Sequence, residues 1–315
     1  LYDWANSAFN TVILTFVFSV YFAKGVVGDE ATGSSLWGFT IGMAGLGVAL
    51  LSPILGAIAD HAGSRKPWLG VLMVITALGT ACLWFATPDP GSITLVITLV
   101  VITSIAFELG QVFYNAMLPS VAPAGAMGRI SGLGWGLGYF GGLACLALCL
   151  TLLIQPDPSL FGLDAEAQEP VRATALLVAI WFAVFAVPLF LFTRDPGATT
   201  SLPVGPAVKA GLRQLWQSLK ALPAQGDLLR FLIASALYRD GLGTLFAVGG
   251  LYAAGTFGME FDEILIFAIG LNVTAGLGAI AFGWLDDGIG PKTAILLALG
   301  ALIGLGVAVL LVTDK

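Results

Sequence analysis

The segment LGAIADHAGSRKP, at residues 55–67, joins two long apolar stretches of the chain. A second segment, GWLDDGIGPK at residues 283–292, repeats its spacing of glycine and aspartate and also carries a basic residue near its end. The positions in question are Gly56, Asp60, Gly63, Arg65 and Lys66 in the first segment and Gly283, Asp287, Gly290 and Lys292 in the second. We expect Pro67 and Pro291 to lie in the first turn of the helix that follows each loop. Two copies of one charged loop indicate that the chain contains a repeated structural unit.

The composition is that of a membrane protein. Of the 315 residues, 58% are hydrophobic and 10% are charged, whereas soluble domains contain about 25% charged residues. Apolar runs of roughly 20 residues can cross a bilayer as helices, and we find nine, near residues 4–26, 36–58, 67–86, 92–117, 129–154, 171–193, 229–255, 263–283 and 291–312. The sequence lacks the short alternating segments that are typical of a membrane β-barrel. We therefore predict an all-α polytopic membrane protein.

Lysine and arginine concentrate in the loops on one side of the predicted bundle. That side carries most of them, including Arg65, Lys66, Arg129, Arg194 and Lys292. Because cytoplasmic loops carry the excess of basic residues, the N-terminus is predicted to be cytoplasmic. The short loops and the abundance of alanine and glycine favour a bacterial inner membrane, with a vacuolar membrane as the alternative. The net charge of −6 comes largely from acidic residues in loops, which we interpret as solvated.

The longest polar segment divides the chain into three regions. Six predicted spans occupy residues 1–194, and three occupy residues 229–315. The intervening residues 195–228 begin with a stretch rich in proline, glycine, serine and threonine and continue with apolar residues at helical spacing. We predict a cytoplasmic linker that contains an amphipathic helix. This helix either lies on the membrane surface or serves only to connect the two sets of spans.

The repeated loop resembles the signature loop of the major facilitator superfamily, G-x-x-x-D-x-x-G-x-R-K, and residues 283–292 resemble its weaker second copy. Other segments resemble the branch that contains the vacuolar amino-acid effluxers and their bacterial relatives: YDWANSAF at 2–9, FYNAMLP at 113–119, RISGLGWGLGYFGG at 129–142 and DGLGT at 240–244. The resemblance implies two six-helix halves that rock about a site near the membrane midplane. Since twelve spans are expected of such a protein, residues 229–315 are predicted to form an incomplete second half of a C-terminally truncated chain.

Few ionisable residues lie inside the predicted spans, where each costs about 2.5–3.5 kcal/mol on insertion scales. Arg239 and Asp240 lie near the midplane of the seventh span, which is the expected depth of a substrate. Arg239 is a candidate ligand for a substrate carboxylate, and Asp240 would balance its charge in the empty state. A structural ion pair is the alternative. The same region contains two further candidate substrate ligands, Tyr238 and Asn272.

Glu108 lies in the fourth span between Phe107 and Leu109. An apolar surrounding favours the neutral form of a carboxyl group, and a proton-coupled carrier can use such a group. Proton coupling through Glu108 is therefore one hypothesis. The alternative is that Glu108 is a permanent partner of Arg239 or of a cytoplasmic arginine such as Arg129.

Several polar residues are predicted to line the cytoplasmic mouth of a cavity. They belong to the first and fourth spans and comprise Asn6, Asn10, Gln111, Tyr114 and Asn115. Buried amides tend to point into the protein rather than toward lipid. Asp3 also lies on this face of the first span, but its place at a helix N-terminus is explained by the helix dipole alone.

The fifth span contains glycines at four-residue spacing, which lets two helices approach closely. The two ladders are Gly128, Gly132 and Gly136, and Gly134, Gly138 and Gly142. We interpret them as a packing surface between helices rather than a binding site, with a sliding surface as a further hypothesis. They do not form a nucleotide-binding loop, because neither a preceding strand nor a following Walker-type lysine is present.

The sequence gives little indication of catalysis or of a bound cofactor. Cys82, Cys145 and Cys149 lie inside predicted spans without metal-ligand spacing, and the single histidine, His61, belongs to the repeated loop. We expect no metal, no cofactor, no nucleic-acid partner and a monomeric state. The leading hypothesis is a secondary carrier for a small polar solute, most plausibly an amino acid, with or without protons. The alternatives are a carrier for another organic anion or drug-like solute, and a membrane scaffold.

Overall fold

A computed structural model describes residues 1–61, 64–123, 125–195, 204–257 and 261–312. All the regular elements within these residues are helices, and every predicted apolar run coincides with one. The prediction of an all-α protein is therefore confirmed. In the part of the chain that the structure describes, eight segments are long and apolar enough to cross a membrane: Tyr2–Val27, Glu30–Gly56, Lys66–Phe85, Pro90–Val121, Met127–Ile154, Glu169–Phe192, Ile269–Ile289 and Pro291–Val309. The remaining predicted span, 229–255, coincides with the helix Gly226–Phe257.

The first span is the least regular. It consists of α1 (Tyr2–Ala8), the π-helix η1 (Phe9–Phe16), α2 (Phe18–Tyr21) and a second π-helix, η2 (Phe22–Val27). Val17 lies at the break between η1 and α2. In η1 the hydroxyl of Thr15 donates to the carbonyl of Asn10 at 2.9 Å, which satisfies a carbonyl group within the wider turn.

The next five spans are mainly α-helical, with short 3₁₀ or π turns at some of their ends. They comprise α3 (Glu30–His61), α4 (Lys66–Cys82) with η3 (Leu83–Phe85), η4 (Pro90–Ser92) with α5 (Ile93–Val121), α6 (Met127–Leu148) with η5 (Cys149–Ile154), and α7 (Glu169–Phe192). Pro67 lies in the first turn of α4, as predicted from the sequence, because proline has no N–H group to lose there.

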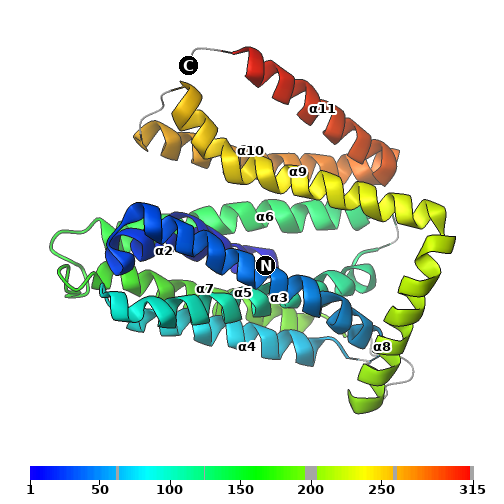
Figure 1. The fold of residues 1–315 in the computed structure, drawn as a ribbon, viewed down its shortest axis with the longest axis horizontal. Helices are drawn as coiled ribbons and strands as arrows, with labels where there is room; N and C mark the ends of the chain where they lie inside the picture. Colours follow the sequence, from blue (N-terminus) through cyan, green and yellow to red (C-terminus); the bar gives the residue numbers. More distant parts are fainter. Residues whose placement is uncertain (62–63, 124, 196–203, 258–260, 313–315) are drawn as a thin grey trace.

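The linker and the last spans follow. α8 (Val204–Ala221) and η6 (Leu222–Ala224) lead to α9 (Gly226–Phe257), α10 (Phe261–Ile289) and α11 (Pro291–Leu311). Pro291 lies in the first turn of α11, again as predicted, and the preceding Gly290 has φ +84°, a conformation that favours glycine. Figure 1 shows α9, α10 and α11 on one side of α6 and the earlier spans on the other, with α8 running crosswise at one end.

Aromatic side chains fill much of the core between the first six spans. The rings of Tyr2 and Tyr114 are 4.5 Å apart between centroids, and those of Phe9 and Phe107 are 5.2 Å apart. Trp68 and Phe113 stack with an interplanar angle of 2°. Since lipid is as apolar as these side chains, close van der Waals packing rather than removal from water holds the helices together.

The outer surface of the bundle is strongly apolar. On α3, Leu46 and Leu50 are 65% and 67% exposed, and Leu191 on α7 is 69% exposed. Large exposed apolar patches are rare on soluble monomers. This surface suits hydrocarbon, and together with the long apolar helices it identifies a multi-pass membrane protein.

Candidate functional site

The glycine ladders of α6 bring its backbone into contact with two other helices. A Cβ atom at Gly136 would lie 2.7 Å from the carbonyl oxygen of Gly276 in α10, and one at Gly283 of α10 would lie 2.5 Å from the carbonyl oxygen of Gly128. Gly132 contacts Gly283 and the carbonyl of Ala279 in the same way. No side chain fits these positions without displacing backbone. The ladder 128–132–136 therefore forms the contact between α6 and α10.

The second ladder contacts the first span. A Cβ atom at Gly134 would lie 2.6 Å from a carboxylate oxygen of Asp3, and one at Gly138 would lie 2.7 Å from the hydroxyl of Ser7. Gly142 lies against the hydroxyl of Thr11. Consequently α6 has close contacts on two faces, one with α1 and η1 and the other with α10.

The second copy of the repeated loop closes the contact between α6 and α10 at one end. The carboxylate of Asp287 accepts hydrogen bonds from the backbone N–H groups of Gly128, at 2.7 Å, and Arg129, at 3.1 Å. It also pairs with the Arg129 guanidinium at 3.0 Å, and that guanidinium lies 5.3 Å from the ring centroid of Trp284. Asp287 thus caps the N-terminus of α6 from a different helix, where unsatisfied N–H groups and the helix dipole favour an anion.

The first copy of the loop joins helix ends among the earlier spans. Arg65 donates to the carbonyl of Ala116 in α5 at 2.6 Å. The ammonium group of Lys66 donates to the carbonyls of Phe190, at 2.9 Å, and Thr193, at the end of α7. Cations are favoured at the C-terminal ends of helices, where the last carbonyls lack intrahelical partners.

Asp195 completes this arrangement. Its carboxylate accepts from the backbone N–H of Lys66 at 2.8 Å and from the hydroxyl of Ser64. Burial acts to raise the pKa of Asp195, but hydrogen bonds from Ser64, Lys66 and Arg65 and the charge of Lys66 outweigh it and hold the pKa below its usual value. The beginning of α4 and the end of α7 are therefore held by a reciprocal pair of charged caps. Of the predicted loop residues, Gly63 and the side chain of Asp60 lie outside the described part.

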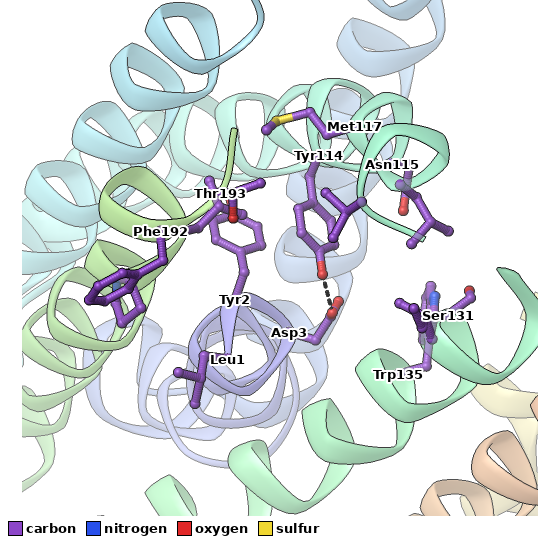
Figure 2. Close-up of a pocket in the computed structure, with 15 residues that line it drawn as sticks. Leu1, Tyr2, Asp3, Tyr114, Asn115, Met117, Ser131, Trp135, Phe192 and Thr193 are labelled. Atoms are coloured by element: carbon purple, nitrogen blue, oxygen red, sulfur yellow. Dashed lines mark hydrogen bonds between the residues drawn. The ribbon is translucent and has the colours of Figure 1, made fainter. Parts of the chain in front are cut away.

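A cavity of about 320 Å³ opens near the start of α1. Its lining includes Asp3, Tyr114, Asn115, Ser131 and Trp135. The hydroxyl of Tyr114 donates to the carboxylate of Asp3, and Figure 2 shows this pair with Ser131 and Trp135 across from it. The cavity joins α1, α5, α6 and α7 at the end of the bundle that carries the two charged loops. We call this end the basic end, after Arg65, Lys66, Arg129 and Lys292.

Two predicted site residues are close in sequence to members of two aromatic pairs. Asn6 lies between Tyr2 and Phe9 in the chain, and Gln111 lies between their ring partners Phe107 and Tyr114. The Nδ2 atom of Asn6, a donor, and the Oε1 atom of Gln111, an acceptor, are buried without a hydrogen-bond partner among the described residues. Buried polar atoms of this kind are normally satisfied. These two atoms therefore retain the capacity to form hydrogen bonds.

The other predicted site residues are more dispersed. Asn10 in η1 is exposed, and Glu108 is exposed on α5 although its neighbours Phe107 and Leu109 are buried. On α9, Arg239 and Asp240 are exposed and Tyr238 is half-buried. Asn272 on α10 is half-buried. Of the predicted polar site residues, only Tyr114 and Asn115 line the cavity in Figure 2.

Sequence reasoning did not identify three residues that shape these sites. Asp3 was explained as a helix-dipole residue, and its bond to Tyr114 depends on the approach of spans one and four. Asp195 contacts Lys66 across 129 positions of sequence, and no local pattern indicates that contact. Ser131 lies within the glycine-rich segment, where only the glycines stand out.

Comparison with known proteins adds the family context. A family profile described as "Vacuole effluxer Atg22 like" matches residues 19–127 and 123–305. The chain is 29% identical over 300 residues to the "Uncharacterized MFS-type transporter YxiO" of Bacillus subtilis, an alignment that covers 94% of this chain and 68% of YxiO. It is 26% identical over 164 residues to "Autophagy-related protein 22-1" of Neosartorya fischeri, covering 49% of this chain and 26% of that protein.

A solved structure supports the fold. The proton:xylose symporter XylE, a major facilitator protein, superposes with a TM-score of 0.60 at 16% identity, covering 91% of this chain and 66% of XylE. At that identity the likeness shows the fold alone. The chain therefore has the major facilitator fold, and it spans about two thirds of the length of YxiO and XylE.

Proposed function

Because this chain belongs to the Atg22-like vacuole effluxer family of the major facilitator superfamily, we propose that it moves a small polar solute across a membrane by alternating access. The contact between α6 and α10 is the observation that carries the proposal. Two helix backbones meet there through glycines and are closed at one end by the Asp287 cap. Such a contact can open at one end while its backbones stay together.

The proposed moving bodies are the two sets of spans. Residues 1–194 form one half, residues 229–315 belong to the other, and residues 195–228 connect them. The caps formed by Lys66 and by Asp195, the first residue of the connecting segment, hold the start of α4 against the end of α7, so that the first half moves as a unit. The cap formed by Asp287 links α6 to α10, so that it acts as the closing contact between the halves.

The solute is proposed to be an amino acid. Family membership supports this choice. The Asn6 Nδ2 donor and the Gln111 Oε1 acceptor, which lack partners among the described residues, are suited to a carboxylate and an ammonium group, respectively. Arg239 is proposed to hold the substrate carboxylate, with Asp240 as its counter-charge in the empty state. Asn10, Gln111, Tyr114, Asn115, Tyr238 and Asn272 complete the proposed lining.

Proton coupling is proposed to run through Glu108. Its exposed position on α5, with buried residues on either side, leaves the carboxyl accessible from the space outside the helix bundle of the first half. The proposed orientation places the basic end in the cytoplasm, because basic loops remain on that side. A bacterial inner membrane is the proposed location, and the monomer is the proposed functional unit.

Counterflow in proteoliposomes tests the proposal. The full-length protein is reconstituted, loaded with an unlabelled amino-acid mixture and supplied with the same mixture in labelled form at two pH values. Saturable counterflow, reduced at least tenfold in Arg239→Ala and retained in Arg230→Ala, is the expected result. Arg230 is a matched control because it lies on the same helix and forms an exposed ion pair with Asp227.

The alternatives predict different outcomes of the same experiment. Counterflow of organic anions or drug-like compounds but not of amino acids would assign the protein to another substrate class. Absence of counterflow with every solute, from protein that is folded and monodisperse, would contradict a carrier function and favour a scaffold.

A further inference from the structure

The helix α8 differs in charge from the rest of the chain. Residues 204–221 contain Lys209, Arg213 and Lys220 and no acidic residue, although the whole chain has a net charge of −6. The helix follows α7 and precedes α9, and both of those neighbours meet it at the basic end. A compact patch of three positive charges therefore lies at one end of an otherwise acidic protein.

The orientation of α8 is that of a helix parallel to the membrane plane. Figure 1 shows it running crosswise to the spans. One face contacts α3, where Gly211 is buried and Leu215 is half-buried. The adjoining face is uncovered, because Leu212, Trp216 and Leu219 are 42%, 60% and 52% exposed. Exposed apolar side chains on an amphipathic helix indicate a surface that a partner or a membrane covers.

Apolar and basic side chains occupy adjacent stripes of this uncovered surface. At 100° per residue, Lys209, Arg213, Trp216 and Lys220 fall within one narrow sector of the helix. Leu212 and Leu219 fall in the neighbouring sector. The ammonium group of Lys220 lies 5.0 Å from the ring centroid of Trp216. Tryptophan with lysine or arginine at its side is typical of the level of lipid headgroups.

The uncovered face of α8 adjoins the exposed apolar surface of α3. That surface includes Leu46 and Leu50, which are among the most exposed apolar residues of the bundle. Because α8 contacts α3 and runs crosswise to it, a bilayer that covered this face of α3 would have its surface at the level of α8. The apolar stripe then meets acyl chains, and the basic stripe meets headgroups.

We propose that α8 binds negatively charged phospholipid headgroups through Lys209, Arg213 and Lys220, with Leu212, Trp216 and Leu219 inserted at the membrane surface. Charge complementarity favours this occupant over a zwitterionic lipid, because each basic residue near an anionic bilayer strengthens association by about fivefold. The proposal does not depend on which solute the protein carries. Binding of an acidic protein segment is the competing outcome.

Quenching of Trp216 by brominated lipids tests the proposal with the full-length protein in nanodiscs. One preparation contains brominated phosphatidylglycerol in unlabelled phosphatidylcholine, and the other contains the reverse combination at equal bromine density. Subtraction of the Trp216→Phe signal isolates the fluorescence of this residue. We expect the brominated anionic lipid to quench Trp216 at least threefold more strongly than the brominated zwitterionic lipid, and we expect 1 M salt to remove the difference.

Two matched variants decide the role of charge. Replacement of all three basic residues by glutamine is expected to abolish the preference for the anionic lipid. The charge-retaining variant Lys209→Arg, Arg213→Lys, Lys220→Arg is expected to preserve it. Equal quenching by both lipids in the parent protein would overturn the proposal, and so would Trp216 emission that neither lipid quenches. If the triple glutamine variant does not fold, the three single variants provide the same test, with a stepwise loss expected.

Discussion

Replacement of Asp287 by alanine is predicted to open the basic end of the protein. The change removes two backbone hydrogen bonds at the start of α6 and the ion pair with Arg129. Loss of a helix N-cap costs about 0.5–2 kcal/mol. The ion pair adds less than about 1 kcal/mol, because the Arg129 side chain is 41% exposed and solvent screens it.

These terms together give about 0.5–3 kcal/mol, which corresponds to a shift of about two- to 150-fold in the equilibrium between closed and open states. In the proposed cycle the Asp287 contact exists only while α6 and α10 are closed at the basic end, so the whole shift is expected to favour the open state. Salt screens the ion pair between Asp287 and Arg129 more than the hydrogen bonds from the backbone N–H groups of Gly128 and Arg129. Most of the shift in population is therefore expected to persist in 0.5 M salt.

Double electron–electron resonance on the full-length protein measures these populations. Spin labels at Val121 and Lys292, which are both exposed at the basic end, report the distance between the two sets of spans. Asp227→Ala is the matched control, because its ion pair with Arg230 is fully exposed and contributes little. Equal distance distributions for Asp287→Ala and Asp227→Ala would refute the assignment of Asp287 as the closing contact.

Three further predictions concern the glycine contact between α6 and α10, the Asp195 cap and the proposed proton site at Glu108. Gly136→Leu is expected to abolish transport or to reduce it more than tenfold, whereas Gly278→Leu is tolerated, because only Gly136 lies against another backbone; initial rates in proteoliposomes compare the two. The pKa of Asp195 is lowered in the folded protein. Its carboxylate therefore stabilises the fold above the usual aspartate pKa of about 3.9, and this stabilisation is lost as the pH falls through the lowered pKa. Between pH 5 and 3, the thermal stability of Asp195→Asn should therefore decrease less than that of the parent protein. Glu108→Gln should remove the pH dependence of counterflow, and a pH profile identical to that of the parent would contradict a coupling role.

Hydropathy and helix-terminal residues predicted most of the fold. Each apolar run became a helix because a spanning segment must satisfy its backbone hydrogen bonds internally. Pro67 and Pro291 correctly predicted where α4 and α11 begin, since each proline was expected in the first turn of a helix. The π-helical turns of the first span were not predicted, because the residues of η1 do not differ in type from those of an ordinary apolar helix.

The candidate site was predictable only in part. The repeated loops marked Lys66 and Asp287 as charged residues near helix ends, and the structure gives each a helix terminus to cap. Their partners could not be read from the sequence, because Asp195 and Arg129 meet them only after distant helices pack. Glu108 illustrates the same limit: its apolar sequence neighbours are buried, but the helix turns its own side chain outward.

Alternating access is tested most directly by the distance between the two sets of spans at the end opposite the basic end, measured when Asp287→Ala opens the basic end. Spin labels are placed away from the basic end, at Gln155, which follows η5, and at Leu311, the last residue of α11. Their separation is measured in the Asp287→Ala background of the full-length protein. A rocking carrier predicts that this distance shortens as the Val121–Lys292 distance lengthens, with matching changes in population. If the Gln155–Leu311 distance stays unchanged, or if both distances lengthen together, the halves do not rock about the contact between α6 and α10. Either result contradicts the proposed mechanism.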